Sequence, residues 1–171
     1  MWSRFRLLEK NREEILAYVA SKPEEIIRQS RTNQWSMIQA VRHVQLAEAG
    51  SIGYMQKKIL AGDAMKEATR LPRVLLTLVD VSFRSGLKFK APVAIQHPPV
   101  TSLAELKADW DSTRESLKQF IENYPEKWSA KAVYKHPFVG MLSLSEALRF
   151  FRIHQAHHIR QVHRIARSLK N

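Results

Sequence analysis

Cysteine is absent from the 171-residue chain, and glycine, proline and long apolar runs are scarce. Without cysteine there are no disulfides and no thiolate ligands, so a metal could bind only through histidine, carboxylate or water. Only 5 glycines and 7 prolines stand against 44% hydrophobic residues, which favours a globular, mostly helical protein over a disordered one. The longest strongly apolar run, 74–79, is far shorter than the ~20 residues of a membrane span, and the charged N-terminal stretch lacks an apolar signal core. We therefore expect a soluble, cytoplasmic protein.

Acidic residues are also few. The chain has 28 lysines and arginines against 16 acidic residues, and its net charge is +12. Such a charge suits nucleic acid, anionic lipid or an anionic small substrate, and it is equally typical of a solvated basic surface. The sequence has no run of five or more like charges, which argues against a nucleic-acid-binding tail. We expect a small-molecule substrate as the partner and no association with a membrane, and nucleic acid is disfavoured.

Helical periodicity of the hydrophobic residues dominates the chain. It predicts a less regular helix at 73–85 and four long helices, at 3–20, 36–60, 102–124 and 143–169. Three of these starts carry a capping box, in which a serine hydroxyl and the side chain three residues later satisfy open backbone N–H groups: Ser36 with Gln39, Ser102 with Glu105, and Ser143 with Glu146.

The segments between these helices give weaker signals. The proline-containing stretch 87–100 is predicted to be extended, and 126–141 to be a loop with at most a short extended piece. No convincing set of strands emerges. We predict one all-α domain over 1–171, an antiparallel four-helix bundle with long connections.

Three of the seven histidines lie close together in the last predicted helix, within His-Gln-Ala-His-His-Ile-Arg-Gln at 154–161. At 100° per residue, His154 and His158 fall on the apolar face, His157 falls at its edge, and His163 points toward water. Two stacked imidazoles at i and i+4 suit one metal ion, and burying both without partners would cost free energy. Hydrogen-bonded core histidines are the alternative, and the spacing leaves both interpretations open.

A third ligand would have to come from another helix, and His43 is the candidate. Its neighbours one turn away, Gln39, Ala40 and Ala47, are mostly small, which would let a second helix approach closely. Taken alone, however, His43 is better explained as a partly buried packing residue.

The remaining candidates are weaker. His97 and His136 each precede a proline in a predicted loop, where they would be surface or loop-packing residues, with His136 near the mouth of a site. No carboxylate is placed as a general base. Glu48 is expected on the solvated surface, and Glu146 lies two turns before the histidine cluster.

Two motifs resemble those of the DinB/YfiT-like superfamily of metal-binding four-helix bundles. The first is Asn-Gln-Trp-Ser-Met-Ile-Gln-Ala-Val-Arg-His at 33–43, and the second runs from 136 to 161 and contains the histidine cluster. The resemblance covers nearly the whole chain and implies a divalent metal held by His43, His154 and His158. The side chains expected around these ligands are His157, Gln161 and Gln39.

The resemblance also implies a function. Members of the superfamily are described as metal-dependent hydrolases, and better understood relatives are thiol-dependent transferases or isomerases. A divalent cation (Zn, Ni, Mn or Fe) on three imidazoles keeps coordination positions open and could activate water or a low-molecular-weight thiol cosubstrate. The resemblance further implies a homodimer. The alternatives are a non-enzymatic basic helical bundle, whose structural metal supports binding of a partner or nucleic acid, and a bundle that has lost its metal.

Overall fold

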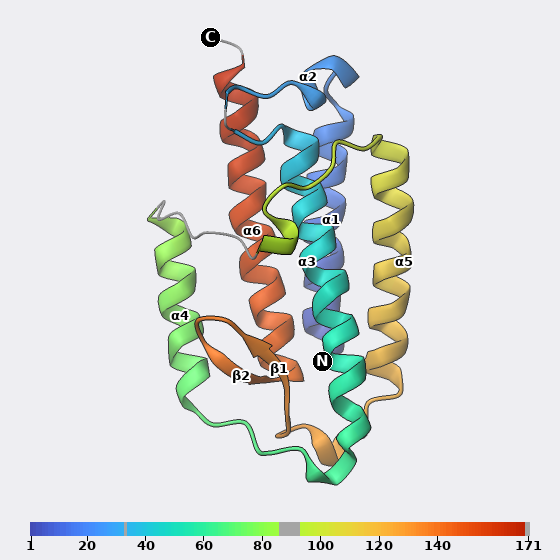
Figure 1. Ribbon diagram of the computed structural model, residues 1–171, viewed down its shortest axis with the longest axis vertical. Helices are drawn as coiled ribbons and strands as arrows, with labels where there is room; N and C mark the ends of the chain where they lie inside the picture. The colour runs from blue at the N-terminus through green and yellow to red at the C-terminus, as the bar shows by residue number, and fades with distance from the viewer. Residues whose placement is uncertain (33, 86–92, 170–171) are drawn as a thin grey trace.

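Four long helices form the body of the computed structural model, which describes residues 1–32, 34–85 and 93–169 (Figure 1). They are α1 (Trp2–Ala20), α3 (Met37–Lys58), α5 (Leu103–Glu122) and α6 (Leu144–Ser168). Helices α1 and α3 each pack against both α5 and α6. In Figure 1, α1 and α6 run upward while α3 and α5 run downward, so α3 and α6 are antiparallel neighbours. The predicted all-α four-helix fold with long connections is confirmed.

Three of these helices begin where the capping boxes predicted. At the start of α3, Ser36 Oγ accepts a hydrogen bond from the Gln39 backbone N–H at 3.3 Å, and Gln39 Oε1 accepts one from Ser36 N–H at 3.0 Å. The same reciprocal pair opens α5 at Ser102 and α6 at Ser143. These starts fix the register of α3 and α6, and therefore the direction of every side chain that the two helices carry.

Shorter helices connect the four long ones. They are α2 (Glu24–Arg28), α4 (Leu71–Arg84) and three 3-10 segments, η1 (Ile59–Ala64), η2 (Val93–Ile95) and η3 (Glu126–Trp128). Helix α4, predicted at 73–85, lies outside the bundle against α6 and β2 (Figure 1). The extended conformation expected for 87–100 is wrong at Val93–Ile95, where the chain makes a helical turn. Residues 86–92 of that connection lie outside the described part of the chain.

A β-hairpin precedes α6 and corrects the expectation of a loop without convincing strands. Strands β1 (Ala132–His136) and β2 (Gly140–Ser143) pair antiparallel, with His136 opposite Gly140. Gly140 adopts φ 88°, a left-handed conformation that favours glycine. Strands of five and four residues are too short for alternation of polar and apolar residues to stand out in the sequence. The hairpin runs directly into α6 and therefore lies beside its first turns.

The bundle has two hydrophobic clusters separated by polar side chains. One cluster includes Leu8, Ile52, Leu117 and Phe151, and the other includes Ile15, Val41, Trp110 and Val162, so each long helix contributes to both. Between them lies a group that we call the polar layer: Glu9, Arg12, Glu48, Arg114, His154, Gln155 and His158. Along the described ranges, no helix combines the length and apolar character needed to cross a membrane.

Candidate metal centre

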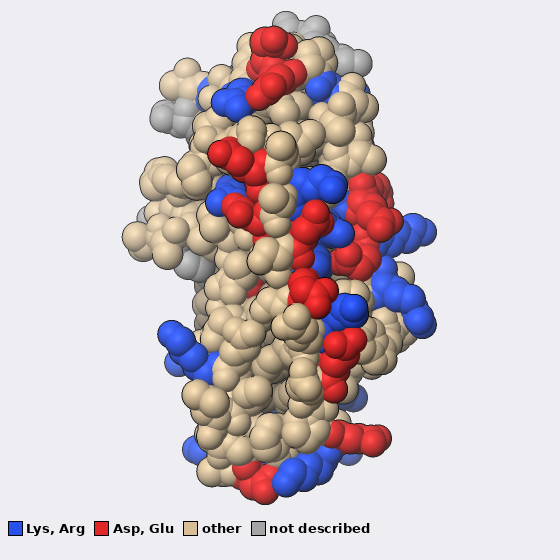
Figure 2. Space-filling view, turned by 90° about the vertical axis from the view of Figure 1, so that its right-hand side faces the viewer, with Lys and Arg blue, Asp and Glu red and all other residues tan. Residues whose placement is uncertain are grey.

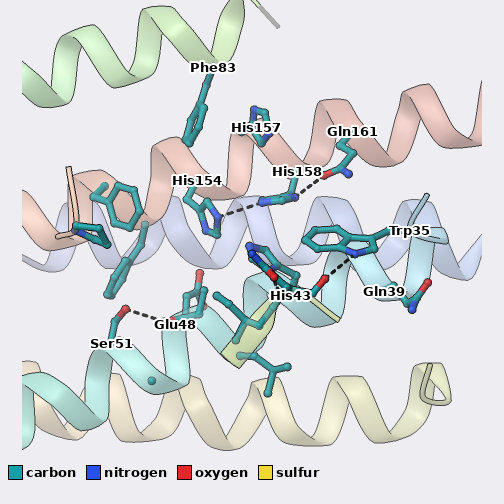
Figure 3. Close-up of a pocket in the computed structure, with 18 of the residues that line it drawn as sticks. Trp35, Gln39, His43, Glu48, Ser51, Phe83, His154, His157, His158 and Gln161 are labelled. Carbon is teal, nitrogen blue, oxygen red and sulfur yellow. Dashed lines mark hydrogen bonds between the residues drawn. The ribbon is translucent and has the colours of Figure 1, made fainter. Parts of the chain in front are cut away.

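Three histidines from two antiparallel helices meet in the wall of a cavity (Figure 3). His43 comes from α3, and His154 and His158 come from α6. One ring nitrogen of each lies within 4.8 Å of the corresponding nitrogens of the other two, a group that could hold a metal ion. His43 and His158 are only 4% and 5% exposed. The structure thus brings together the three residues that the sequence predicted as ligands.

Hydrogen bonds orient two of these rings. His43 Nδ1 lies 3.0 Å from the Ile95 carbonyl oxygen, and His158 Nδ1 lies 2.7 Å from Gln161 Oε1. Because an oxygen of this kind can only accept, each Nδ1 carries the hydrogen and each Nε2 keeps its lone pair. His158 Nε2 faces His154 Nε2 at 3.0 Å. The tautomers of His43 and His158 thus leave both Nε2 atoms able to bind a metal, which is the orientation that metal-binding histidines require.

Burial holds these imidazoles in their neutral form. Desolvation lowers the pKa of His43, and it lowers the pKa values of His154 and His158 well below the ordinary 6.5. Neighbouring imidazoles lower the pKa values of His154 and His158 further, because two cationic rings would repel each other. A metal competes with protons for the same lone pairs, so the neutral state favours its binding near pH 7.

The residues around the three histidines come from several elements. The Trp35 ring lies 4.7 Å from the His43 ring, and Trp35 Nε1 donates to the Gln96 carbonyl at 3.1 Å. Gln39 Nε2 donates to the Pro98 carbonyl at 3.0 Å. These two bonds hold the 93–98 segment, whose Ile95 carbonyl orients His43. Gln39 therefore acts on the site through this segment, and among the described contacts it has no bond to a histidine.

The cavity beside the histidines has a volume of about 1110 Å³. Its lining comes from α3, α4, the 94–97 segment, the hairpin and α6. On α6 it extends from Phe150 to Ser168, which corresponds to about 27 Å of helix. His157 lies on this wall, with its ring 4.3 Å from that of Phe83 in α4. The candidate metal centre is therefore open to a ligand of substantial size.

A comparison with known families agrees with this architecture. A family model described as the DinB superfamily matches residues 7–162. The chain belongs to the DinB superfamily.

A solved structure titled "Crystal structure of TT2238, a four-helix bundle protein" has the same fold as this DinB-superfamily chain. The two share 21% sequence identity with a TM-score of 0.62, over 96% of this chain and 99% of the other. No curated protein matches the chain. Membership of the DinB superfamily and the buried three-histidine group are together compatible with a metal-binding protein.

Glu48 was expected on the surface of this DinB-superfamily protein, and that expectation is wrong. Its side chain is 1% exposed and lines the cavity. It accepts hydrogen bonds from Trp110 Nε1 at 2.7 Å and Gln155 Nε2 at 2.9 Å, and it pairs with Arg114 Nη2 at 2.8 Å. Burial raises the pKa of Glu48, while Arg114 and the two donors oppose the shift. Helix α3 lies between α5 and α6, so a residue that points away from His43 is still buried.

The structure also tests the positions that the sequence predicted for His136 and His163. His136 ends β1 and is 6% exposed, so the surface or loop position expected for it is wrong. It does line the cavity, which agrees with its expected nearness to a site. Burial lowers its pKa to about 4. His163, expected to face water, is instead half-buried with its ring 4.0 Å from that of Tyr18. The reason is that α6 packs against α1 as well as α3, so two of its faces are covered.

Several residues of the site were not predicted from the sequence, because no sequence pattern indicated them. Tyr134 lines the cavity, and its hydroxyl oxygen lies 3.1 Å from Ser51 Oγ on α3. Phe83 of α4 and the Ile95 carbonyl also contribute. These contacts join positions 52 and 83 residues apart, and neither periodicity nor local spacing reports on such separations.

Proposed function

We propose that the chain is a metal-dependent enzyme in which His43, His154 and His158 hold a divalent cation that activates water or a thiol cosubstrate. The reaction would be hydrolysis or thiol-dependent transfer to a small molecule. One observation carries the proposal: three nitrogens that could ligate lie within 4.8 Å of one another in the wall of a cavity of about 1110 Å³.

The donor set suits a catalytic cation better than a purely structural one. Structural zinc sites usually have four protein ligands, whereas catalytic sites keep a position for water or substrate. The group found among the described residues has three histidines and no carboxylate. A cation bound there would supply Lewis acidity, which lowers the pKa of a water or a thiol. Zn, Ni, Mn and Fe all accept imidazole, and the donor set does not distinguish among them.

The chain's own residues would orient the ligands and shape the site. Ile95 and Gln161 fix the Nδ1–H tautomers of His43 and His158, so that each Nε2 is free to bind. Trp35 covers one side of the His43 ring. The absence of cysteine means that any thiol nucleophile would arrive with a cosubstrate.

The test is metal content, measured by elemental mass spectrometry on untagged protein purified without a chelator. We expect about one divalent ion per chain, lost in His43→Ala and in His154→Ala. His163→Ala is the matched control, because this residue lies on the same helix against Tyr18 and should leave the metal in place. A chain that takes up no Zn, Ni or Mn after dialysis would refute the proposal.

Nucleic-acid binding by a basic bundle with a structural metal is the competing function. Its support is the net charge of +12. On the face that carries α5, however, basic and acidic side chains alternate (Figure 2). Arg12 pairs there with Asp111, and Arg42 with Asp109. Duplex DNA binding that weakens steeply with salt would favour this function over an enzyme.

A homodimer and a cytoplasmic location, both expected from the sequence, are further proposals. An exposed apolar row on α4 offers one surface for a second copy: Leu71, Val74, Leu78 and Val81. Light scattering coupled to size-exclusion chromatography should give twice the chain mass. A monomer at concentrations above about 100 μM would contradict the dimer.

A further inference from the structure

The cavity continues beyond the three histidines toward the hairpin. On α6, Phe150 lies on one side of His154, and Arg164 lies on the other, about 15 Å further along the helix. We call the part beside the hairpin the hairpin subsite, and its walls are Tyr54, Tyr134, His136, Phe138, Phe150 and Phe151. The Phe150 ring lies 4.2 Å from the His136 ring and 5.6 Å from the His154 ring. One small molecule could therefore contact both the hairpin subsite and the metal centre.

The backbone fixes the tautomer of His136. Its Nδ1 accepts hydrogen bonds from the N–H groups of Phe138 at 3.2 Å and Val139 at 3.1 Å. A nitrogen that accepts two such bonds carries no hydrogen, so in the neutral ring the hydrogen is on Nε2. Among the described residues, nothing accepts a hydrogen bond from this Nε2. His136 therefore presents a donor of fixed position in the wall of the cavity.

The neighbouring hydroxyl of Tyr134 already uses its hydrogen in a hydrogen bond within the protein. Ser51 Oγ lies 2.6 Å from the Ala47 carbonyl, which can only accept, so the serine hydrogen points there. Tyr134 and Ser51 are 3.1 Å apart, and the tyrosine must supply the hydrogen between them. The Tyr134 hydroxyl thus has no hydrogen left for a ligand, in contrast to His136.

The charges along the cavity disfavour an anion beside the hairpin. Of the described lining residues, Glu48 is the only carboxylate and Arg164 the only lysine or arginine. Glu48 lies one turn from Ser51 on α3, on the hairpin side, whereas Arg164 lies far along α6. Glu48 is paired with Arg114, so its charge is compensated, and no lysine or arginine of the described lining lies beside the hairpin. An anion there would lose water without gaining a counter-charge, whereas a neutral acceptor would not.

We propose that the hairpin subsite binds a neutral hydrogen-bond acceptor, of the carbonyl class, carried on an aromatic group, and that His136 Nε2–H is its donor. The aromatic walls would bury the ring, and the hydrogen bond would set the orientation of the carbonyl toward the histidine centre. As a substrate subsite this rests on the proposed function, but the binding event itself does not require a metal.

Two substitutions separate the two roles of His136. His136→Asn keeps an oxygen where Nδ1 lies, so the Phe138 and Val139 N–H groups stay satisfied while the Nε2 donor is lost. His136→Gln places an amide N–H near the Nε2 position and gives up the Nδ1 acceptor. Benzamide is the probe, toluene is the matched ligand without an acceptor, and benzoate is the anionic one. Dissociation constants would come from two-dimensional NMR titrations of chelator-treated protein, in which long-range ring 1H–15N correlations also report the tautomer.

We expect the Nε2–H tautomer, and binding of benzamide that weakens about threefold to tenfold in His136→Asn, the effect of one neutral hydrogen bond. The dissociation constant of benzamide for His136→Gln should stay within about twofold of that for the original chain. Toluene should bind both variants equally. Benzoate should bind more weakly than benzamide. Equal losses for toluene and benzamide, or no benzamide binding up to its solubility limit, would overturn the inference.

These outcomes are independent of the metal measurement. If the chain binds no metal but its benzamide affinity still depends on His136, the proposed enzyme is refuted and the subsite is retained. If the chain binds one metal per molecule but its benzamide affinity does not change on substitution of His136, the subsite is refuted and the proposed enzyme is retained.

Discussion

At the scale of single residues, the ligand candidates depend on partners that the chain places around them. His158 is oriented by Gln161 one turn later on α6, and His43 by a backbone carbonyl 52 residues away. Both partners accept a hydrogen from Nδ1 and so leave Nε2 available. Such partners affect metal affinity without touching the metal.

Replacing Gln161 tests this effect. Gln161→Leu removes the acceptor at 2.7 Å from His158 Nδ1 and should lower metal affinity by about 10–100-fold. Gln161→Glu keeps an acceptor for His158 Nδ1–H and should bind the metal at least as tightly as the original chain does. Competition with a chromogenic chelator measures both affinities. Gln119→Leu, at an exposed position on α5, is the control, and a Gln161→Leu affinity equal to that of the control would disprove the orienting role.

The buried histidines also predict how stability depends on pH. Burial lowers the folded-state pKa values of His136 and His157 to about 4, against an ordinary 6.5. The unfolded chain therefore binds more protons below pH 6.5, so the free energy of unfolding is highest above that pH and falls as the pH drops toward 4. Urea unfolding at pH 7, 5.5 and 4.5, with chelator present, measures the decline. His136→Asn should make it shallower, and a stability constant across this range would contradict the prediction.

At the scale of helices, an ion-pair network connects α1, α3 and α5. Arg114 of α5 pairs with Glu48 of α3 at 2.8 Å and with Glu9 of α1 at 2.9 Å. Gln155 of α6 donates to Glu48 at 2.9 Å. Because Glu48 and Arg114 are 1% and 3% exposed, neither charge has water to replace a lost partner.

Removing one partner should therefore be costly. Arg114→Met leaves the Glu48 carboxylate buried without its counter-charge and should lower the free energy of unfolding by about 3–5 kcal/mol. Adding Glu48→Gln should restore part of this loss, since the unpaired charge disappears. Arg28→Met, which breaks an exposed pair with Glu24 on α2, is the control and should cost no more than ~1 kcal/mol. Denaturant unfolding compares the three variants, and equal costs for Arg114→Met and Arg28→Met would show that the network is not important for stability.

At the scale of the whole molecule, the polar layer divides the core between two hydrophobic clusters. The candidate metal centre joins α3 to α6 at that level. A cation that binds only the folded chain stabilises the entire bundle through mass action.

Zinc or nickel should therefore raise the melting temperature. At a free concentration of 100 Kd, binding adds about 2.7 kcal/mol, or roughly 5–10 °C for a chain of this size. Calorimetry or thermal fluorescence would show the shift, which should vanish in His154→Ala and persist in His163→Ala. An identical shift in His154→Ala would mean that the metal binds elsewhere.

The sequence by itself determined the features that depend on neighbours within one helix. Capping boxes at Ser36, Ser102 and Ser143 gave the helix starts, and the i, i+4 spacing put His154 and His158 on one buried face. A helix has a fixed period, so these relationships survive in any tertiary setting.

Only the tertiary structure decided which elements cover the remaining faces. It buried Glu48 and half-buried His163, because α3 and α6 each pack against more than one neighbour. It formed the hairpin that brings His136 to the cavity, and it placed the Ile95 carbonyl on His43. Such contacts depend on the packing of segments far apart in the chain, and no local pattern encodes them.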